Sequence, residues 1–365
     1  MTLEADIVER INSGKLSPEI LDCIVLDYLE KFRKQIKQKF YRKKAGNDGK
    51  KFIEYIMIEN VRALYQSPPV LFYILLENHD KLKDLMNLKY LITYKKYRDF
   101  DHKRKSLKKN IKNTIKRNFK KKVDEMYILD TTIRETDLNR IRKGKFIKEG
   151  IYDAEFVHSS TKGTVVGFTV CTLVNWSNLS VEKVEFYPKN TSKKKMWKEM
   201  VIDTLGTKTG KIKVVIADAG FFAYQNYLFS IHYRLIPVIK SRVNLKDKLL
   251  RKIKELPLSL VWYDQRYTKI FETLLKEFHE IISLTVSYIE KYDDFKKKRG
   301  EIELIFKIAK RIFGMEDLHV YYTDQAYWNI YIYLYLSSLF HQYLTLHGIN
   351  PKRAVELFQQ NHGLT

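Results

Sequence analysis

The stretch from Lys213 to Asp218 reads KVVIAD, an unbroken apolar run that ends in a carboxylate. A strand with apolar side chains on both faces must be covered on both faces, so this run predicts a central strand of a sheet that lies between helices. The segment YILDTT, which begins at Tyr127, is a second short apolar strand. Two further β-rich runs lie between them, TVVGFTVCTLVNW at 164–176 and LSVEKVEFYP at 179–188.

Helices are expected to alternate with the later strands. Thr191 and Ser192 are typical helix caps, and they precede a run with its apolar side chains on one side. A second helix is predicted over 222–233 and a last strand over 234–240. The order of three strands, helix, strand, helix and strand predicts an α/β fold in which a mixed sheet is flanked by helices.

The chain is strongly basic, because 67 Lys and Arg against 43 Asp and Glu give a formal net charge of +24 over 365 residues. An excess of this size indicates a polyanionic partner, and a basic surface kept for solubility alone is the alternative. Residues 1–122 are predicted to be all-helical, with Ser17 and Pro18 at one helix start. We therefore predict that this first part is a basic, helical DNA-binding region.

The basic character is strongest in residues 103–122, which hold 11 Lys or Arg among 20 positions. Apolar side chains recur every fourth residue there, which indicates an amphipathic helix with one thin apolar stripe. The cationic remainder is either a solvated face or a surface that binds DNA phosphates, and we favour phosphate binding. The candidate phosphate contacts are Lys108, Lys109, Lys112, Lys116 and Arg117.

Features that would indicate export or a membrane are weak. Cys23 and Cys171 are far apart and form no CxxC pattern, which argues against a zinc module or a disulfide framework and fits a reducing cytoplasm. The first residues, MTLEADIVERIN, contain acids and no apolar signal region. Residues 327–346 are apolar but contain His341 and Gln342, so we expect a buried helix rather than a membrane span. The expected location is the cytoplasm, in association with the nucleoid.

Two aspartates, Asp130 and Asp218, each end a predicted strand of the same sheet. A single aspartate after a strand is commonly a turn or cap residue. Two of them could converge at one sheet edge, where their oxygens are ligands that Mg²⁺ prefers.

A third acid, Glu303, lies in a predicted helix at 299–313. Helical geometry places Arg299, Glu303 and Lys310 within about 40° of one another. The neighbouring apolar face consists of Ile302, Phe306, Ala309 and Phe313. Glu303 stands at the border of this face, whereas Glu301 points further toward solvent and is the weaker candidate. An ordinary Arg–Glu pair on a helix is the alternative.

These motifs together resemble the DDE transposases of bacterial and archaeal insertion sequences. The resemblance rests on DTT at Asp130, on DAGF at Asp218, and on Arg299, Glu303 and Lys310 in the spacing Arg-x3-Glu-x6-Lys. It covers about residues 125–345 and implies a ribonuclease-H-like catalytic domain. The third motif of this subgroup starts with a tyrosine three residues before the arginine, where this chain has Lys296.

The resemblance implies that Asp130, Asp218 and Glu303 hold two Mg²⁺ or Mn²⁺ ions, which would clamp a scissile phosphate for in-line transfer. Arg299, Lys310 and Lys296 would then contact the DNA. The implied partners are double-stranded DNA at the element ends and target, and a second copy in a homodimer assembled on DNA. No nucleotide cofactor is expected, because GTKTGK at 206–211 lacks the spacing and the hydroxyl residue of a phosphate-binding loop.

The expected organisation is a helical DNA-binding region at 1–122 and a catalytic domain at 123–240 and 296–350, with an insertion at 241–295 and a tail at 351–365. Trp262 in the insertion is a candidate for stacking on an extruded base, and core packing is the alternative. The predicted function is a transposase that moves its own element by DNA cleavage and strand transfer. The alternatives are a stand-alone metal nuclease of the same fold and a non-catalytic basic DNA-binding protein.

The basic run generates a first prediction. Replacing Lys108, Lys109, Lys112 and Lys116 by Gln should weaken binding to every DNA sequence and flatten the dependence of affinity on salt, because each lost phosphate contact reduces counterion release. Fluorescence anisotropy with a labelled duplex over a range of salt concentrations measures this slope. An unchanged slope would mean that these lysines face solvent.

Overall fold

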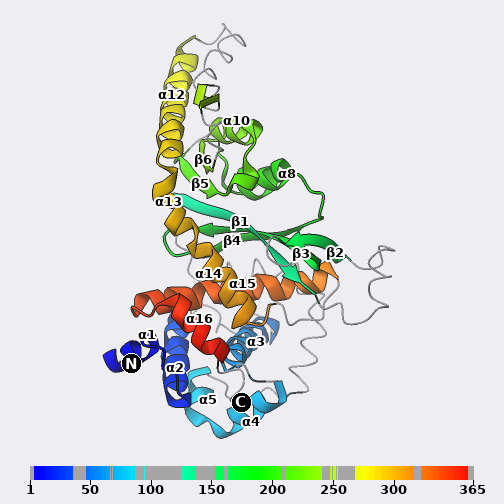
Figure 1. Ribbon diagram of the computed structural model, residues 1–365, viewed down its shortest axis with the longest axis vertical. Helices are drawn as coiled ribbons and strands as arrows, with labels where there is room; N and C mark the ends of the chain where they lie inside the picture. Colours follow the sequence, from blue (N-terminus) through cyan, green and yellow to red (C-terminus); the bar gives the residue numbers. More distant parts are fainter. Residues whose placement is uncertain are drawn as a thin grey trace.

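The protein is described by a computed structural model in which a mixed sheet lies between two layers of helices, with the N-terminal helices packed beneath (Figure 1). The predicted basic run at 103–122, with all its candidate phosphate contacts, and Trp262 lie outside the described residues. The described residues are 4–35, 47–65, 67, 69–86, 94, 125–136, 153–159, 163–207, 210–240, 247, 248, 250, 251, 253, 268–315 and 322–360.

The sheet has six strands in the order β2-β3-β1-β5-β6, and β4 also pairs with β3. The pairs on the β3 side are antiparallel, whereas β1, β5 and β6 run parallel. This arrangement confirms the predicted α/β fold with a mixed sheet flanked by helices, and β2 is a strand that was not predicted from the sequence. The strands are β1 (Met126–Glu135), β2 (Glu155–Ser159), β3 (Gly163–Asn175), β4 (Val181–Tyr187), β5 (Lys213–Ala217) and β6 (Leu235–Ile239).

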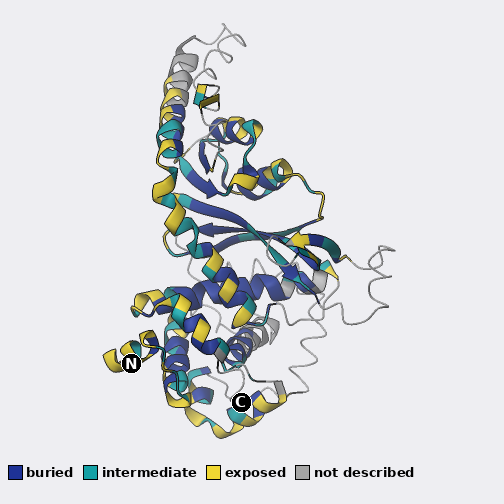
Figure 2. Ribbon diagram, viewed as in Figure 1, coloured by how far each residue is buried: buried dark blue, intermediate teal, exposed yellow. Residues whose placement is uncertain are grey.

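The strands of the sheet and the helix α15 beside it are mostly buried (Figure 2). Alternate side chains of β1 enter two separate apolar cores. Ile128 faces the core shared with α14 (Glu301–Arg311) and α15 (Thr323–Leu346). Leu129 faces the core on the opposite side, which contains the buried Met196 and Trp197 of α8 (Lys193–Trp197). Because strand side chains alternate, Asp130 lies on the α14 face and Thr131 on the α8 face.

The second core is closed by helices that follow the later strands. The helix that starts with α8 continues through a π-helical turn (Lys198–Ile202) into α9 (Asp203–Leu205), and Ser192 caps it as predicted. The helix predicted over 222–233 is α10 (Tyr224–His232). A long helix, α12 (Thr268–Glu290), packs on β6 and α10 through Ile281, Ile282 and Ile289.

The chain ends pack beneath the sheet. Residues 351–360 of the predicted tail form a helix, α16 (Pro351–Gln360), which packs against α14 and α1 because Val355, Leu357 and Phe358 are buried. Within the described part of the chain, neither α15 nor any other helix has the length and apolarity that a membrane crossing needs. The N-terminal helices are α1 (Ala5–Asn12), α2 (Pro18–Gln35), α3 (Asn47–Leu64), α4 (Pro69–Asn78) and α5 (Asp80–Met86).

A buried polar contact joins the N-terminal helices to α15. The Asp27 side chain on α2 is 4% exposed, and its Oδ2 accepts a hydrogen bond from the Tyr343 hydroxyl at 2.8 Å. The Lys31 ammonium lies 3.1 Å from the same oxygen, and the His347 ring lies 3.5 Å from it. A buried carboxylate needs such donors, so α2 and α15 are held in one relative position.

The contact generates a second prediction. Tyr343→Phe should lower the free energy of unfolding by about 1–3 kcal/mol, because the buried Asp27 carboxylate loses a hydrogen-bond donor. Urea denaturation followed by circular dichroism measures the change. Tyr233→Phe is a matched control at a half-buried site outside this contact, and it should cost less than about 0.5 kcal/mol. Equal effects of the two substitutions would contradict this account.

Candidate active site

Asp130 and Asp218 end up side by side because of the register between two parallel strands. Leu129 on β1 is paired with Ala217 on β5, and Asp130 and Asp218 are the residues that follow them. Asp218 comes directly after β5, as predicted, but the prediction that Asp130 ends a strand is wrong, because β1 remains paired with β3 beyond this residue. Neighbouring strands lie about 4.8 Å apart, so the two backbones carry these carboxylates to the same edge of the sheet. β1 continues to Glu135, whereas β5 ends at Ala217, so the edge opens at this point.

The DAGF motif has a local structural reason. Asp218 caps a single 3-10 turn (Ala219–Phe221), and its Oδ1 accepts a hydrogen bond from the Gly220 amide at 3.0 Å. A Cβ atom at Gly220 would come within 3.1 Å of the same oxygen, so a glycine suits this position. Phe221 is buried against Trp197, with ring centroids 6.0 Å apart. The motif therefore anchors the turn and orients the Asp218 carboxylate.

Asp130 is buried, and its carboxylate has two partners. The Thr131 amide donates to Oδ1 at 2.8 Å, and the Arg299 Nη1 lies 3.3 Å from Oδ2. The pKa of Asp130 is raised to about 6, mainly by burial; the Thr131 amide and Arg299 act to lower it, and the nearby Asp218 and Glu303 carboxylates contribute to raising it. The two other acids are therefore close enough to affect the ionisation of Asp130.

The third acid is carried by a bent pair of helices. α13 (Tyr292–Arg299) and α14 meet at Gly300, so Arg299 ends one helix and Glu303 lies in the first turn of the next. The Arg299 Nη2 lies 3.7 Å from the Glu303 Oε1, and the Glu303 side chain is 55% exposed. The predicted apolar face of α14 is buried, which confirms the orientation expected from the sequence; it consists of Ile302, Phe306, Ala309 and Phe313.

An aromatic cluster holds α13 against the sheet. Phe295 meets Trp176, at the end of β3, in an edge-on contact with ring centroids 5.8 Å apart. On its other side Phe295 stacks on Tyr288 of α12 at 5.4 Å. These contacts fix the helix end that carries Arg299.

The three acids are gathered at one edge without forming a finished ligand set. Among the described residues, no group of three or more His, Cys, Asp or Glu side chains is arranged to hold a metal ion. The Arg299 guanidinium lies between Asp130 and Glu303 and interacts with both. Arg299 thus acts as the counter-charge of this carboxylate cluster.

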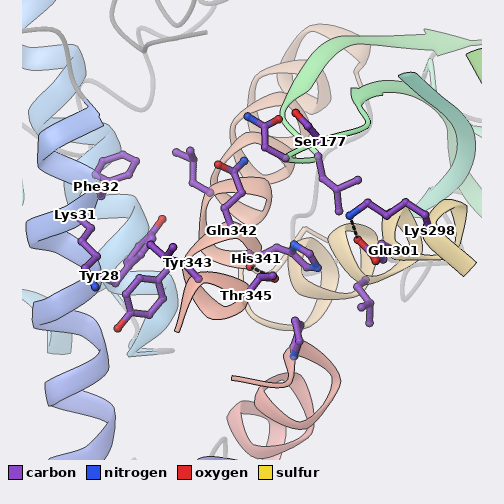
Figure 3. Close-up of a pocket in the computed structure, with 16 residues that line it drawn as sticks. Tyr28, Lys31, Phe32, Ser177, Lys298, Glu301, His341, Gln342, Tyr343 and Thr345 are labelled. Atoms are coloured by element: carbon purple, nitrogen blue, oxygen red, sulfur yellow. Dashed lines mark hydrogen bonds and ion pairs between the residues drawn. The ribbon is translucent and has the colours of Figure 1, made fainter. Parts of the chain in front are cut away.

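Glu301 faces away from the two aspartates, but the prediction that it points further toward solvent than Glu303 is wrong, because its side chain is 32% exposed and that of Glu303 is 55% exposed. Glu301 forms an ion pair with Lys298, and both line a cavity of about 580 Å³ (Figure 3). This cavity lies between α2, α14 and the end of α15, where His341 is buried and its pKa is lowered to about 4 by that burial. Glu301 and Glu303 therefore face two different environments, although both belong to α14.

The other candidate residues on this helix pair lie in different environments. Lys296 is exposed on α13. The Lys310 ammonium donates to the Ile133 carbonyl of β1 at 2.8 Å, so it ties α14 to the extension of β1. Lys193 was not predicted from the sequence, and its ammonium lies 3.1 Å from the Thr131 hydroxyl, beside Asp130. The signal that could have found it is the Ser192 cap, since a helix that follows β4 begins at this edge.

Comparison with known proteins assigns the sequence to a family. The sequence matches the family described as "Transposase DDE domain" over residues 128–337, a range that contains Asp130, Asp218 and Glu303. The chain belongs to this transposase family. No curated protein matches the sequence.

Among solved structures, this transposase-family chain is similar to a piggyBac transposase in a synaptic complex with hairpin DNA. The two share 11% sequence identity and superpose with a TM-score of 0.31. The match covers 66% of this chain and 52% of that one, so the present chain spans about half the length of the piggyBac protein.

The buried aspartate of this transposase domain generates a third prediction. Because the folded pKa of Asp130, about 6, lies above the usual aspartate value of 3.8, its ionisation costs the metal-free fold up to about 3 kcal/mol above pH 6. Asp130→Asn should therefore raise the free energy of unfolding at pH 8, and this advantage should shrink as the pH falls through 6 toward 4. Urea denaturation in EDTA at several pH values measures it.

Asp203→Asn is the matched control, because Asp203 is exposed and pairs only at the surface with Lys198. Its effect should be below about 0.5 kcal/mol. A less stable Asp130→Asn protein at pH 8 would show that the contact with Arg299 outweighs the cost of burying the charge.

Proposed function

We propose that this protein is a transposase that cleaves DNA and joins strands of its own element, with Asp130, Asp218 and Glu303 as the acids that hold two divalent ions. The observation that carries the proposal is the in-register pairing of β1 with β5, which brings Asp130, within β1, and Asp218, directly after β5, to one place at the edge. Glu303, in the first turn of α14, is linked to Asp130 by Arg299, whose guanidinium lies near both carboxylates.

The donor set fits a hard divalent cation. All three side chains offer carboxylate oxygens, which Mg²⁺ and Mn²⁺ prefer. Asp218 and Glu303 both disfavour the ionisation of Asp130, and a bound cation would relieve this repulsion. When bound, two such ions would supply activation of a water or a 3′-hydroxyl and stabilisation of the leaving oxygen.

The residues around the acids have separate roles in this proposal. The Thr131 and Gly220 amides orient the two aspartates, because each donates to one carboxylate oxygen. Glu303 is exposed and sits on a helix turn next to Gly300, so it can reach toward the aspartates when a cation draws it in. Arg299 would then be released from its carboxylate partners to hold a phosphate of the DNA.

The DNA contacts extend beyond the acids. We assign Lys296 and Lys310 to phosphates beside the cleavage site, and the basic run at 103–122 to the duplex further away. Trp262 is proposed to stack on a base near the cleaved position. The partners are double-stranded DNA at the element ends and target, and a second copy of the chain, because joining two ends requires two active sites on one DNA assembly.

The acids generate a fourth prediction. Asp130→Asn, Asp218→Asn and Glu303→Gln should each abolish cleavage of duplexes that carry the DNA flanking the gene, while binding to these duplexes persists. Gel analysis of end-labelled duplexes with Mg²⁺ or Mn²⁺ measures cutting and joining. Glu301→Gln is the matched control on the same helix, because its side chain faces the cavity, and it should cleave like the unmodified protein.

The outcomes separate three functions. Loss of cleavage in the three variants with joining by the unmodified protein supports a transposase. Metal-dependent cutting without joining would indicate a stand-alone nuclease, and binding without cutting would indicate a non-catalytic DNA-binding protein. Full cleavage by the Glu303→Gln protein would reject this glutamate as a ligand. Inverted repeats bracketed by short direct duplications around the gene would independently support movement of an element.

A further inference from the structure

Lys193 lies at the edge of the sheet that carries Asp130 and Asp218. β4 is antiparallel to β3, and β3 is antiparallel to β1, so β4 runs in the same direction as β1 and β5. The helix that follows β4 therefore begins at the end of the sheet that carries the two aspartates. Lys193 is the first residue of that helix, and the Ser192 hydroxyl, which accepts from the Lys195 amide, fixes the starting point.

The ammonium of Lys193 is held between the two aspartate segments. It donates to the Thr131 hydroxyl at 3.1 Å, and Thr131 directly follows Asp130. It also lies 4.6 Å from the ring centroid of Phe221, three residues after Asp218. An ammonium has three donors, so these two contacts leave hydrogen-bonding capacity toward the open edge.

Lys193 differs from its neighbours in its charge balance. Lys195 lies 3.8 Å from Glu199, and Lys198 lies 3.2 Å from Asp203, so these cations have carboxylate partners on the same helix. No ion pair joins Lys193 to an acid within the part of the chain that the structure describes. A half-buried cation without an acid is suited to an anionic ligand.

Lys193 and the two aspartates all influence the pKa of one buried thiol, that of Cys171. Burial raises the pKa of the Cys171 thiol, Lys193 lowers it, and Asp130 and Asp218 raise it. Cys171 pairs with Thr131 across β1 and β3, so the cation and both acids act on the same place in the sheet. An anion that reached the aspartates would thus come within the field of Lys193.

We propose that Lys193 binds a DNA phosphate adjacent to the one held at the carboxylates, and so positions the strand that is cut. This inference rests on the proposed function for its substrate. The cation lies on the α8 face of the sheet and Arg299 on the α14 face, so the two would grip the same strand from opposite sides of the edge. The anchoring by Thr131 and Phe221 would hold the ammonium in place before DNA arrives.

The test compares three substitutions at Lys193 with a neighbour. Lys193→Gln removes the charge, Lys193→Met also keeps the aliphatic stem over Phe221, and Lys193→Arg keeps the charge. The matched control is Lys194→Gln, which removes an exposed cation one position along the helix. Duplexes that carry the DNA flanking the gene are the probe, with Mn²⁺ for cleavage and with EDTA for binding over a range of salt concentrations.

Lys193→Gln and Lys193→Met should slow cleavage about ten-fold or more and reduce the slope of log affinity against log salt by about 0.9, the value for one phosphate contact. Lys193→Arg should stay close to the unmodified protein in both measurements. A purely structural lysine would lower the melting temperature without changing the salt slope, so thermal unfolding is measured on every variant.

The inference is overturned if the uncharged variants match Lys194→Gln in both rate and slope. It is also overturned if cleavage falls while the slope stays unchanged. Failure of the proposed function looks different, because then the unmodified protein cuts no duplex with either ion. The salt slope in EDTA still decides whether Lys193 contacts a phosphate in that case, since it requires binding only.

Discussion

The parallel pairing of β1 with β5 is the contact on which the rest of the site depends. It joins segments nearly ninety positions apart in the chain, and its register makes Asp130 and Asp218 neighbours. A shift by one residue would turn one aspartate to the other face of the sheet. The apolar side chains of β1 enter two separate cores, and those of β5 are all buried in one of them, so a shift would place apolar side chains against polar surroundings.

The same arrangement creates an electrostatic problem that Arg299 reduces. Asp130 is buried beside other acids, so its ionised form is costly in the absence of a cation. Arg299 contributes the compensating charge from a helix end that Phe295, Trp176 and Tyr288 hold in place. The two aspartates are fixed by strands and local amide donors, whereas Glu303 sits on an exposed helical turn. The fixed part and the adjustable part of the candidate ligand set are therefore carried by different kinds of element.

The lower half of the molecule supports this helix from below. α14 packs on α15 and α16, and α15 is tied to the N-terminal helices through Tyr343 and the buried Asp27. The N-terminal helices thus contact the same body that carries Glu303 rather than forming a detached unit. α2 and α14 also line the cavity that contains Lys298 and Glu301 (Figure 3), so the N-terminal helices and the helix that carries Glu303 share one packed environment.

The sequence by itself determined the fold class, the two strands that carry Asp130 and Asp218, and the helix face that orients Glu303, because these features depend on local periodicity and on short motifs. It placed the end of the first strand at Asp130, whereas pairing with β3 extends β1 to Glu135. It missed β2, the packed helix α16 and Lys193. β2 and α16 are short, and long-range packing stabilises them. Only the tertiary structure decided that Arg299 lies between two acids and that Lys193 meets Thr131. Such contacts join distant segments, and no local pattern records where the chain brings them together.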